Sequence, residues 1–164
     1  MRVVSPFESA RDELFGRLAA VFGSKELDVG IRPKVTMGFP VSQPRAYVAV
    51  DEVCDTAATR GAVSCGHDEV EFTIHVWAYA EHSDRAKACN ALLGYVWTIF
   101  CAVLADRMLE RTVGFAIPSV RDASTAVNGS KRFIAAATID VTCTIGSTCP
   151  AWMKEVIDGI EKAG

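Results

Sequence analysis

A long helix without charged side chains constrains this chain more than any other feature of its sequence. The segment EFTIHVWAYAEHSDRAKACNALLGYVWTIFCAVLADRM, from Glu71 to Met108, begins with the two-residue alternation of a strand and changes at His82 to a helical pattern. Between Lys87 and Asp106 it contains no charged residue. A helix at a protein surface normally carries polar residues on its exposed face. Something other than bulk water must therefore cover most of this helix.

The two sides of the helix differ in the size of their side chains. With about 100° per residue, the larger residues form one stripe that we expect to face a sheet: Cys89, Leu92, Leu93, Val96, Phe100, Val103 and Leu104. The opposite stripe holds only small residues: Ala91, Gly94, Thr98, Ala102 and Ala105. A lipid bilayer, another helix of the same chain and a neighbouring subunit all remain as coverings for this small-residue stripe. The bilayer is the least favoured, because a helix placed between strands of one sheet cannot cross a membrane without separating those strands.

The rest of the chain predicts an α+β fold. A capped amphipathic helix is expected over residues 5–23 and a short final helix at about 150–162, while residues 24–45 form a connection rich in Gly and Pro. Strands are predicted at residues 47–53, 69–80, 111–121 and 131–145. Each strand has an aliphatic face and a polar face containing threonine, so helices can cover only one side. The prediction is a two-layer fold with a mostly antiparallel four-stranded sheet and helices packed on one face.

Length and charge exclude several classes of protein. The 164 residues suit a single domain, residues 1–164, with the final helix as its C-terminal element. The 17 Lys and Arg residues against 20 Asp and Glu residues give a net charge of -3, which does not predict a nucleic-acid surface. The start, MRVVSPFESARDE, lacks the apolar core and cleavage site of a secretory signal, so we expect a cytoplasmic compartment.

The six cysteines predict free thiols rather than a metal site. Three lie in apolar segments and are expected to pack as small hydrophobes: Cys89, Cys101 and Cys143. Three lie in loops: Cys54, Cys65 and Cys149. The sequence CGHD offers Cys65 and His67 as ligands, but the second ligand pair that a structural zinc site needs is missing. We therefore predict no metal.

The residues with acid/base chemistry do not form a recognisable motif. Glu71, His75 and Asp140 share the polar face of the predicted sheet. Glu71 and His75 are about 13 Å apart on one strand, which is beyond hydrogen-bond reach, and Asp140 approaches either only if strand pairing places it opposite. A phosphate-binding glycine loop, a nucleophile elbow and a metalloprotease helix motif are all absent from the sequence. We predict no catalytic residues and no cofactor, and expect a protein that binds other proteins.

The order of these segments resembles a known family. The passage from PRAYVAV through EVEFTIHVWAYAEHSDRAKACNALLGYVWTIF to SKRFIAAATIDVTCTI is similar in layout to the tail-terminator, or tail-completion, proteins of long-tailed, lambda-like bacteriophages. The resemblance covers roughly residues 7–145 and lies in element order and hydrophobic pattern, without a signature motif. The final helix and the six cysteines depart from the pattern expected of short members.

The resemblance implies a structural role in the virion. Such proteins form a ring, commonly of six subunits, that caps the tail tube, stops its polymerisation and joins it to the neck. The implied partners are further copies of the chain, the tail-tube protein and a neck or head-completion protein, with DNA passing through the ring, no sequence-specific contact to nucleic acid and no membrane. The implied location is the virion tail, assembled in the host cytoplasm. A neck or head-closure protein and a small α+β enzyme or ligand-binding domain remain as alternatives. Candidate interface residues are Ala91, Gly94, Thr98, Ala102, Thr138 and Thr142.

Overall fold

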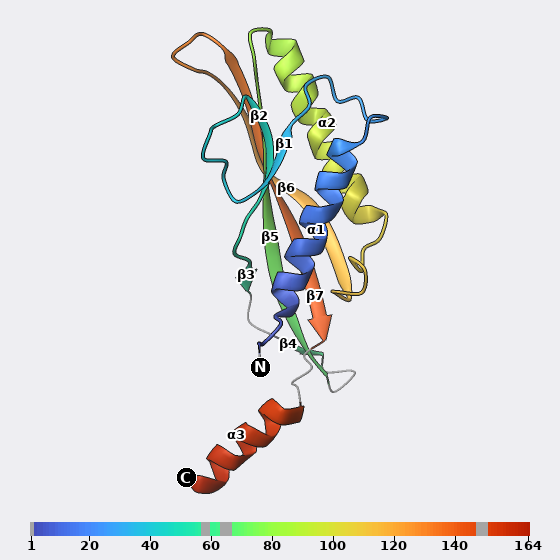
Figure 1. Cartoon of the computed structure of the whole chain (residues 1–164), viewed down its shortest axis with the longest axis vertical. Coiled ribbons are helices and arrows are strands. Elements are labelled where there is room, and N and C mark those ends of the chain that lie inside the picture. The colour runs from blue at the N-terminus through green and yellow to red at the C-terminus, as the bar shows by residue number, and fades with distance from the viewer. Residues whose placement is uncertain (1, 57–59, 63–66, 147–150) are drawn as a thin grey trace.

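The computed structural model describes residues 2–56, 60–62, 67–146 and 151–164. In chain order its elements are α1 (Pro6–Gly23), β1 (Lys34–Met37), β2 (Ala46–Val50), β3 (Asp55–Thr56), β4 (Arg60–Ala62), β5 (His67–His82), α2 (Arg85–Leu104), β6 (Phe115–Val127), β7 (Phe133–Gly146) and α3 (Ala151–Ala163). This is an α+β fold, as predicted. Figure 1 shows α1 and α2 beside the sheet and α3 beyond the end of β7.

The sheet is larger than the sequence predicted. Its main path runs β1-β2-β5-β7-β6, and the short strands β3 and β4 both pair with β5, which makes seven strands among the described residues. The pair of β1 and β2 is parallel, while every other pair is antiparallel. The predicted four strands correspond to β2, β5, β6 and β7. The three strands that were missed have two to four residues each, too few to show a clear alternation.

The core lies between the two helices and one face of the sheet. Strand β5 contributes Phe72, Ile74 and Val76 to the core, all fully buried, and β7 contributes the residues paired with them. From α1, a row of residues at four-residue spacing enters the core: Ala10, Leu14, Leu18 and Phe22. This is the alternation and the helical period that the sequence predicted for these elements.

Local capping explains where the two main helices begin. Ser5 precedes α1 and accepts a hydrogen bond from the backbone amide of Phe7, with Pro6 in the first turn, where a missing amide proton costs nothing. Asp84 precedes α2 and accepts from the amide of Lys87. Because β5 ends at His82, the strand and α2 are joined by only two residues. This short connection keeps α2 close to the sheet.

Helix α2 packs with a different side than expected. Its buried residues are Ala88, Ala91, Leu92, Tyr95, Thr98, Ile99, Ala102 and Val103. Leu93 and Leu104, which were predicted to face the sheet, are 66% and 39% exposed. By length and composition α2 would suffice to cross a membrane, and among the described residues it is the one helix of which this is true. Its position against the sheet and α1 gives an ordinary reason for the apolar composition, because a core helix has the same character.

Candidate functional site

A charge cluster around one buried histidine lies on the face of the sheet opposite the helices. His75 of β5 is only 7% exposed although it points to this open face. Its Nδ1 lies 2.7 Å from Oδ1 of Asp140 on β7, and its Nε2 lies 2.5 Å from Oδ2 of Asp55 on β3. Arg121 of β6 donates from Nε to Oδ2 of Asp140 at 2.9 Å. Four strands thus each contribute one charged side chain to this cluster.

Strand pairing places each member of the cluster. His75 and Asp140 are directly opposite partners in the β5–β7 ladder. Asp55 pairs with Thr73, two residues before His75 and on the same face of β5. Strand β6 has an irregularity between Val120 and Asp122, so Arg121 is the extra residue of a bulge. A bulge changes the direction of a side chain relative to regular alternation, which accounts for the reach of Arg121 toward Asp140.

The charges in the cluster stabilise one another. Burial alone lowers the pKa of His75, but its hydrogen bonds to Asp55 and Asp140 outweigh burial and raise that pKa above its ordinary value. Burial alone raises the pKa of Asp140, but hydrogen bonds from Arg121 and His75 outweigh it and lower that pKa. Nη2 of Arg121 also lies 2.9 Å from Nδ1 of His75, and both side chains contact the carboxylate of Asp140.

Both ring nitrogens of His75 are engaged by carboxylates. Each ring nitrogen of His75 faces a carboxylate, an arrangement that favours the doubly protonated imidazole and agrees with its raised pKa. In that form the ring cannot accept a proton, and both of its N–H groups point at carboxylates. Its role in this geometry is to bind β3, β5, β6 and β7 together through charge.

The sequence-based view of these residues was partly wrong. The expectation that Glu71, His75 and Asp140 form no preformed pair fails for His75 and Asp140, because the ladder register brings them into direct contact. Glu71 is exposed and pairs instead with Thr144, away from the cluster. Asp55 and Arg121 were missed, since a two-residue strand and a bulge leave no periodic signal in the sequence.

An aromatic pocket lies on the same open face, nearer the His82 end of β5. The rings of Phe39 and Trp77 stack with centroids 3.9 Å apart, and those of Tyr47 and Tyr79 stack at 5.0 Å. The pocket has a volume of about 350 Å³ and is lined by Phe39, Pro40, Gln43, Pro44, Tyr47, Tyr79 and Glu81. The pocket was not predicted from the sequence, although Trp77 and Tyr79 at alternate positions of β5 and Tyr47 on the neighbouring strand were a detectable signal.

The acidic side of this pocket is held in place by neighbours. Glu81 accepts hydrogen bonds from Nε of Arg132 at 2.9 Å and from the side-chain amide of Asn128 at 3.1 Å. The Tyr79 hydroxyl donates to the other oxygen of Glu81 at 3.2 Å. The β6–β7 turn, which supplies Asn128 and Arg132, is thereby fixed against the end of β5.

The small-residue stripe of α2 is covered within the chain. Ala91, Thr98 and Ala102 are 2%, 7% and 7% exposed, and a β-carbon added at Gly94 would lie 3.4 Å from Cγ1 of Val29. Helix α1 and the segment that follows it provide this cover. Of the coverings considered, the intramolecular one accounts for the burial of Ala91, Thr98 and Ala102, so these three candidate interface residues lie inside the subunit. Gly94 is half-buried and lines an open pocket, and Ala105 is exposed.

Arg17 of α1 closes the junction between the two helices. Its guanidinium donates to the carbonyl oxygens of Ala102 and Asp106 and pairs with the Asp106 carboxylate at 2.8 Å. These contacts satisfy carbonyl groups that the end of α2 leaves without helical partners. They also explain why α1, rather than a neighbouring subunit, lies along the small residues.

The remaining candidate interface residues and cysteines lie in different parts of the fold. Thr138 and Thr142 are half-buried on the open face, opposite Trp77 and Thr73. Cys143 is buried as predicted, and burial raises its pKa to about 12, but Cys101 is exposed. Cys65 and Cys149 lie outside the described residues, as do the contacts of the CGHD segment. No group of three or more possible metal ligands occurs among the residues that the structure describes.

The exposed side of α2 is apolar, whereas the sequence predicted that its larger apolar residues face the sheet. Leu93 and Trp97 are each 66% exposed and Leu104 is 39% exposed, with partly buried Phe100 between them. We call these four residues the outer stripe of α2.

A comparison of the sequence with protein-family models and with curated proteins finds no match.

Proposed function

We propose that this protein is a structural subunit of a bacteriophage tail, a tail terminator that assembles into a six-membered ring like that of the resembled family. The ring caps the tail tube, ends its polymerisation and presents a surface to the neck. The observation that carries the proposal is that one chain leaves two unlike apolar surfaces uncovered. These surfaces are the outer stripe of α2 and the free edge of β6.

The free edge of β6 is long and carries exposed apolar side chains, with the polar stretch from Arg121 to Thr125 between Val120 and Val127. The strand spans Phe115–Val127 at the end of the sheet path, with β7 as its neighbour. Its exposed apolar residues are Phe115, Ile117, Val120 and Val127. Pro118 fits an edge position, since it has no amide proton to donate to a further strand. Long apolar edges invite pairing with other chains, and natural proteins cover them or protect them with charges. A neighbouring subunit is the cover we propose.

Two unlike surfaces favour a ring over a symmetric pair. In a two-fold dimer the same patch meets itself, whereas head-to-tail contacts join different patches and close into a ring when the rotation allows. The resemblance in element order then supplies the biological setting: tail-tube protein below the ring, neck or head-completion protein above it, and DNA passing through. The saturated cluster around His75 is consistent with a structural rather than a catalytic role.

Sedimentation and tube-capping measurements test this proposal. The full-length chain, alone at high concentration and mixed with tail-tube protein, should sediment well above the 17.7 kDa of one chain. Added to polymerising tube protein, it should halt elongation and appear at tube ends in electron micrographs. A strict monomer under both conditions, with tubes of unchanged length, would refute the proposal. Binding to head-completion protein without any effect on tubes would favour a neck protein instead.

The aromatic pocket favours a second candidate function, a ligand-binding domain. A volume of about 350 Å³ lies at the lower end of the range for small-molecule sites, and the lining combines aromatic rings with one carboxylate. A fragment screen by NMR would show shifts confined to Tyr47, Tyr79 and Glu81 if this function holds. If these shifts are not observed and the protein caps tubes, the structural role is supported and the ligand-binding function is not.

A further inference from the structure

We infer that α3 of one copy packs against the outer stripe of α2 on the next copy, so that α3 is the strap between neighbouring subunits. This inference rests on the proposed ring and names the contact that would build it. It follows from two helices of the same chain that each present an unpartnered apolar side.

The outer stripe of α2 has the spacing of a helix-packing seam. Leu93, Trp97, Phe100 and Leu104 follow one another at intervals of four, three and four residues. This alternation is the one by which helices pack side by side at a small crossing angle. The stripe extends about 17 Å along the helix at 1.5 Å per residue. It contains no charged residue, so a partner helix would not have to neutralise a buried charge.

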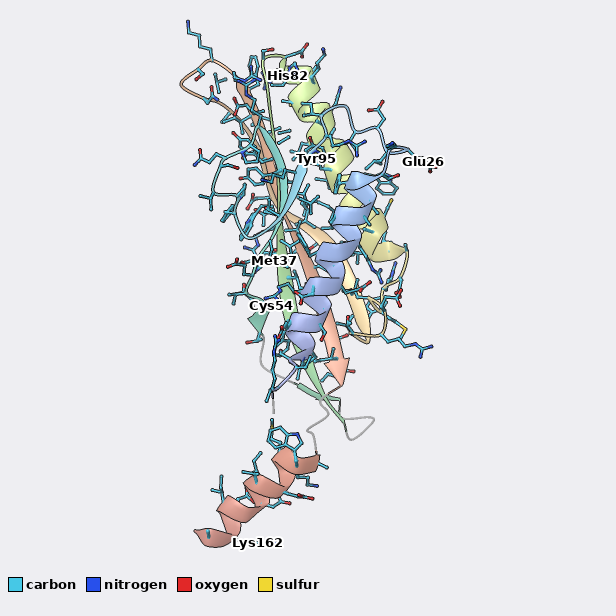
Figure 2. The ribbon with its side chains drawn as sticks, viewed as in Figure 1. Glu26, Met37, Cys54, His82, Tyr95 and Lys162 are labelled. Atoms are coloured by element: carbon cyan, nitrogen blue, oxygen red, sulfur yellow. The ribbon has the colours of Figure 1, made fainter. Side chains whose placement is uncertain are left out.

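Helix α3 has the complementary property. It buries none of its side chains, and Figure 2 shows them projecting on all sides as far as Lys162, with no other element beside the helix. Its apolar residues lie on one side: Trp152, Met153, Val156, Ile157 and Ile160. Its acidic and basic residues lie on the other side, and the helix is about 20 Å long, close to the length of the outer stripe.

An isolated helix of this length is not expected to be stable by itself. Helices shorter than about 12 to 15 residues are marginal in water, and most helices in proteins are stabilised by packing of an apolar face. The 13 residues of α3 fall in this range. Four of the five apolar residues of α3 are 43% to 68% exposed and Met153 is half-buried, so the packing that would stabilise the helix is not provided within one chain.

The position of α3 favours a second copy as the partner. Glu69 pairs with Gly146, the last residue of β7, whereas α2 begins after His82 at the other end of β5, about 43 Å away at 3.3 Å per residue. Helix α2 returns about 30 Å of that distance. Its outer stripe lies on the side turned away from the buried residues of the helix. The chain's own α3 lies beyond the end of β7, away from α2, and buries none of its side chains (Figure 1).

A strap of this kind joins unlike surfaces. Each copy donates α3 to one neighbour and accepts α3 from the other on α2, which is a head-to-tail contact. The contact therefore propagates from copy to copy around a ring. The free edge of β6 remains available for a separate contact.

Cross-linking between copies tests the strap. Full-length Ile157→Cys protein, mixed from unlabelled and ¹⁵N-labelled preparations, is assembled, treated with a short bismaleimide and analysed by peptide mass spectrometry. Cys101 is exposed beside the outer stripe, so we expect linked peptides containing residues 101 and 157, with unlabelled and labelled peptides joined to each other. The Asp158→Cys variant, whose cysteine lies on the polar side of α3, should give several-fold less of the corresponding product.

Two charged variants provide an independent readout. Trp97→Asp and Ile157→Asp place a charge at exposed positions, so each monomer should stay folded by circular dichroism while the oligomer is lost in sedimentation. Asp158→Ala should leave the oligomer intact. Linked peptides of a single isotope would mean that α3 folds back on its own chain and would overturn the inference. An intact ring without this cross-link would overturn the strap but leave the proposed function standing. A cross-linked product that never exceeds a dimer would support the contact between α3 and α2 but overturn the proposed ring.

Discussion

Removing the carboxylate of Asp140 should weaken the fold measurably, because this group joins two strands to β7. It accepts hydrogen bonds from Nδ1 of His75 at 2.7 Å and from Nε of Arg121 at 2.9 Å. A hydrogen bond to a charged group contributes about 1.5 to 3 kcal/mol. The Arg121 side chain is 50% exposed, so solvent screening reduces its share, and we expect Asp140→Ala to cost about 2 to 3 kcal/mol in total. For a domain of this size that corresponds to a fall in Tm of about 5 to 10 °C.

The pH dependence of stability gives this prediction a distinct signature. The pKa of His75 is raised in the folded state, so its contribution is fully present below the unfolded value of about 6.5 and is lost as pH rises through the folded pKa. The pKa of Asp140 is lowered, so its contribution is present above about 3.9 and is lost as pH falls through the folded pKa. The stability advantage of the natural protein over His75→Gln should therefore be largest between about pH 4 and 6.5 and shrink toward pH 9.

Urea denaturation followed by circular dichroism measures these differences in the free energy of unfolding. Glu71→Ala is the matched control, since Glu71 is an exposed carboxylate on the same strand as His75 and pairs with Thr144, away from the cluster. It should change stability by less than about 0.5 kcal/mol. If Asp140→Ala proves as stable as Glu71→Ala, or if the His75→Gln difference is flat from pH 5 to 9, the charge cluster does not contribute in the way described.

Two further substitutions test the packing of α2. Gly94→Leu should destabilise the monomer by about 1 to 3 kcal/mol, because the new side chain would meet Val29. Gly16→Leu is the control and should not destabilise the monomer, because there is open space around Gly16. Equal stability of the two variants in thermal melts would contradict the close contact between Gly94 and Val29. Tyr95→Phe removes the hydroxyl that donates to the carbonyl of Ile31 in the core and should cost about 1 to 2 kcal/mol in urea denaturation, and an unchanged unfolding midpoint would show that this bond contributes nothing.

The element types were predictable because each is written in a local period. Strand β5 alternates buried and open-face residues along most of its length, and α1 repeats buried residues every four positions, so neither depends on distant parts of the chain. The turn between β6 and β7 also carries a local signal, because Asn128-Gly129 is a dipeptide that favours tight hairpin turns, and the turn closes with a backbone hydrogen bond from Asn128 to Arg132. The short strands β1, β3 and β4 fell below the length at which a period can be recognised.

The orientation of α2 could not be derived from its composition. Both sides of the helix are uncharged, so a ranking by size placed Leu93 and Leu104 against the sheet. The small residues were instead drawn inward, where they allow α1 and Val29 to approach closely, and larger residues such as Trp97 were left outside. Hydrophobic periodicity identifies the sides of a helix but does not say which side a particular neighbour fits.

The sequence by itself determined which segments form strands and helices and which face of β5 and β7 is aliphatic, because these properties depend on residues within a few positions of one another. Only the tertiary structure decided that His75 meets Asp140, 65 residues away, and that a bulge brings Arg121 to both. A shift of one residue in the β5–β7 register would send these side chains to different partners and faces. That register is fixed by the packing of the whole sheet against α1 and α2, which no local pattern records.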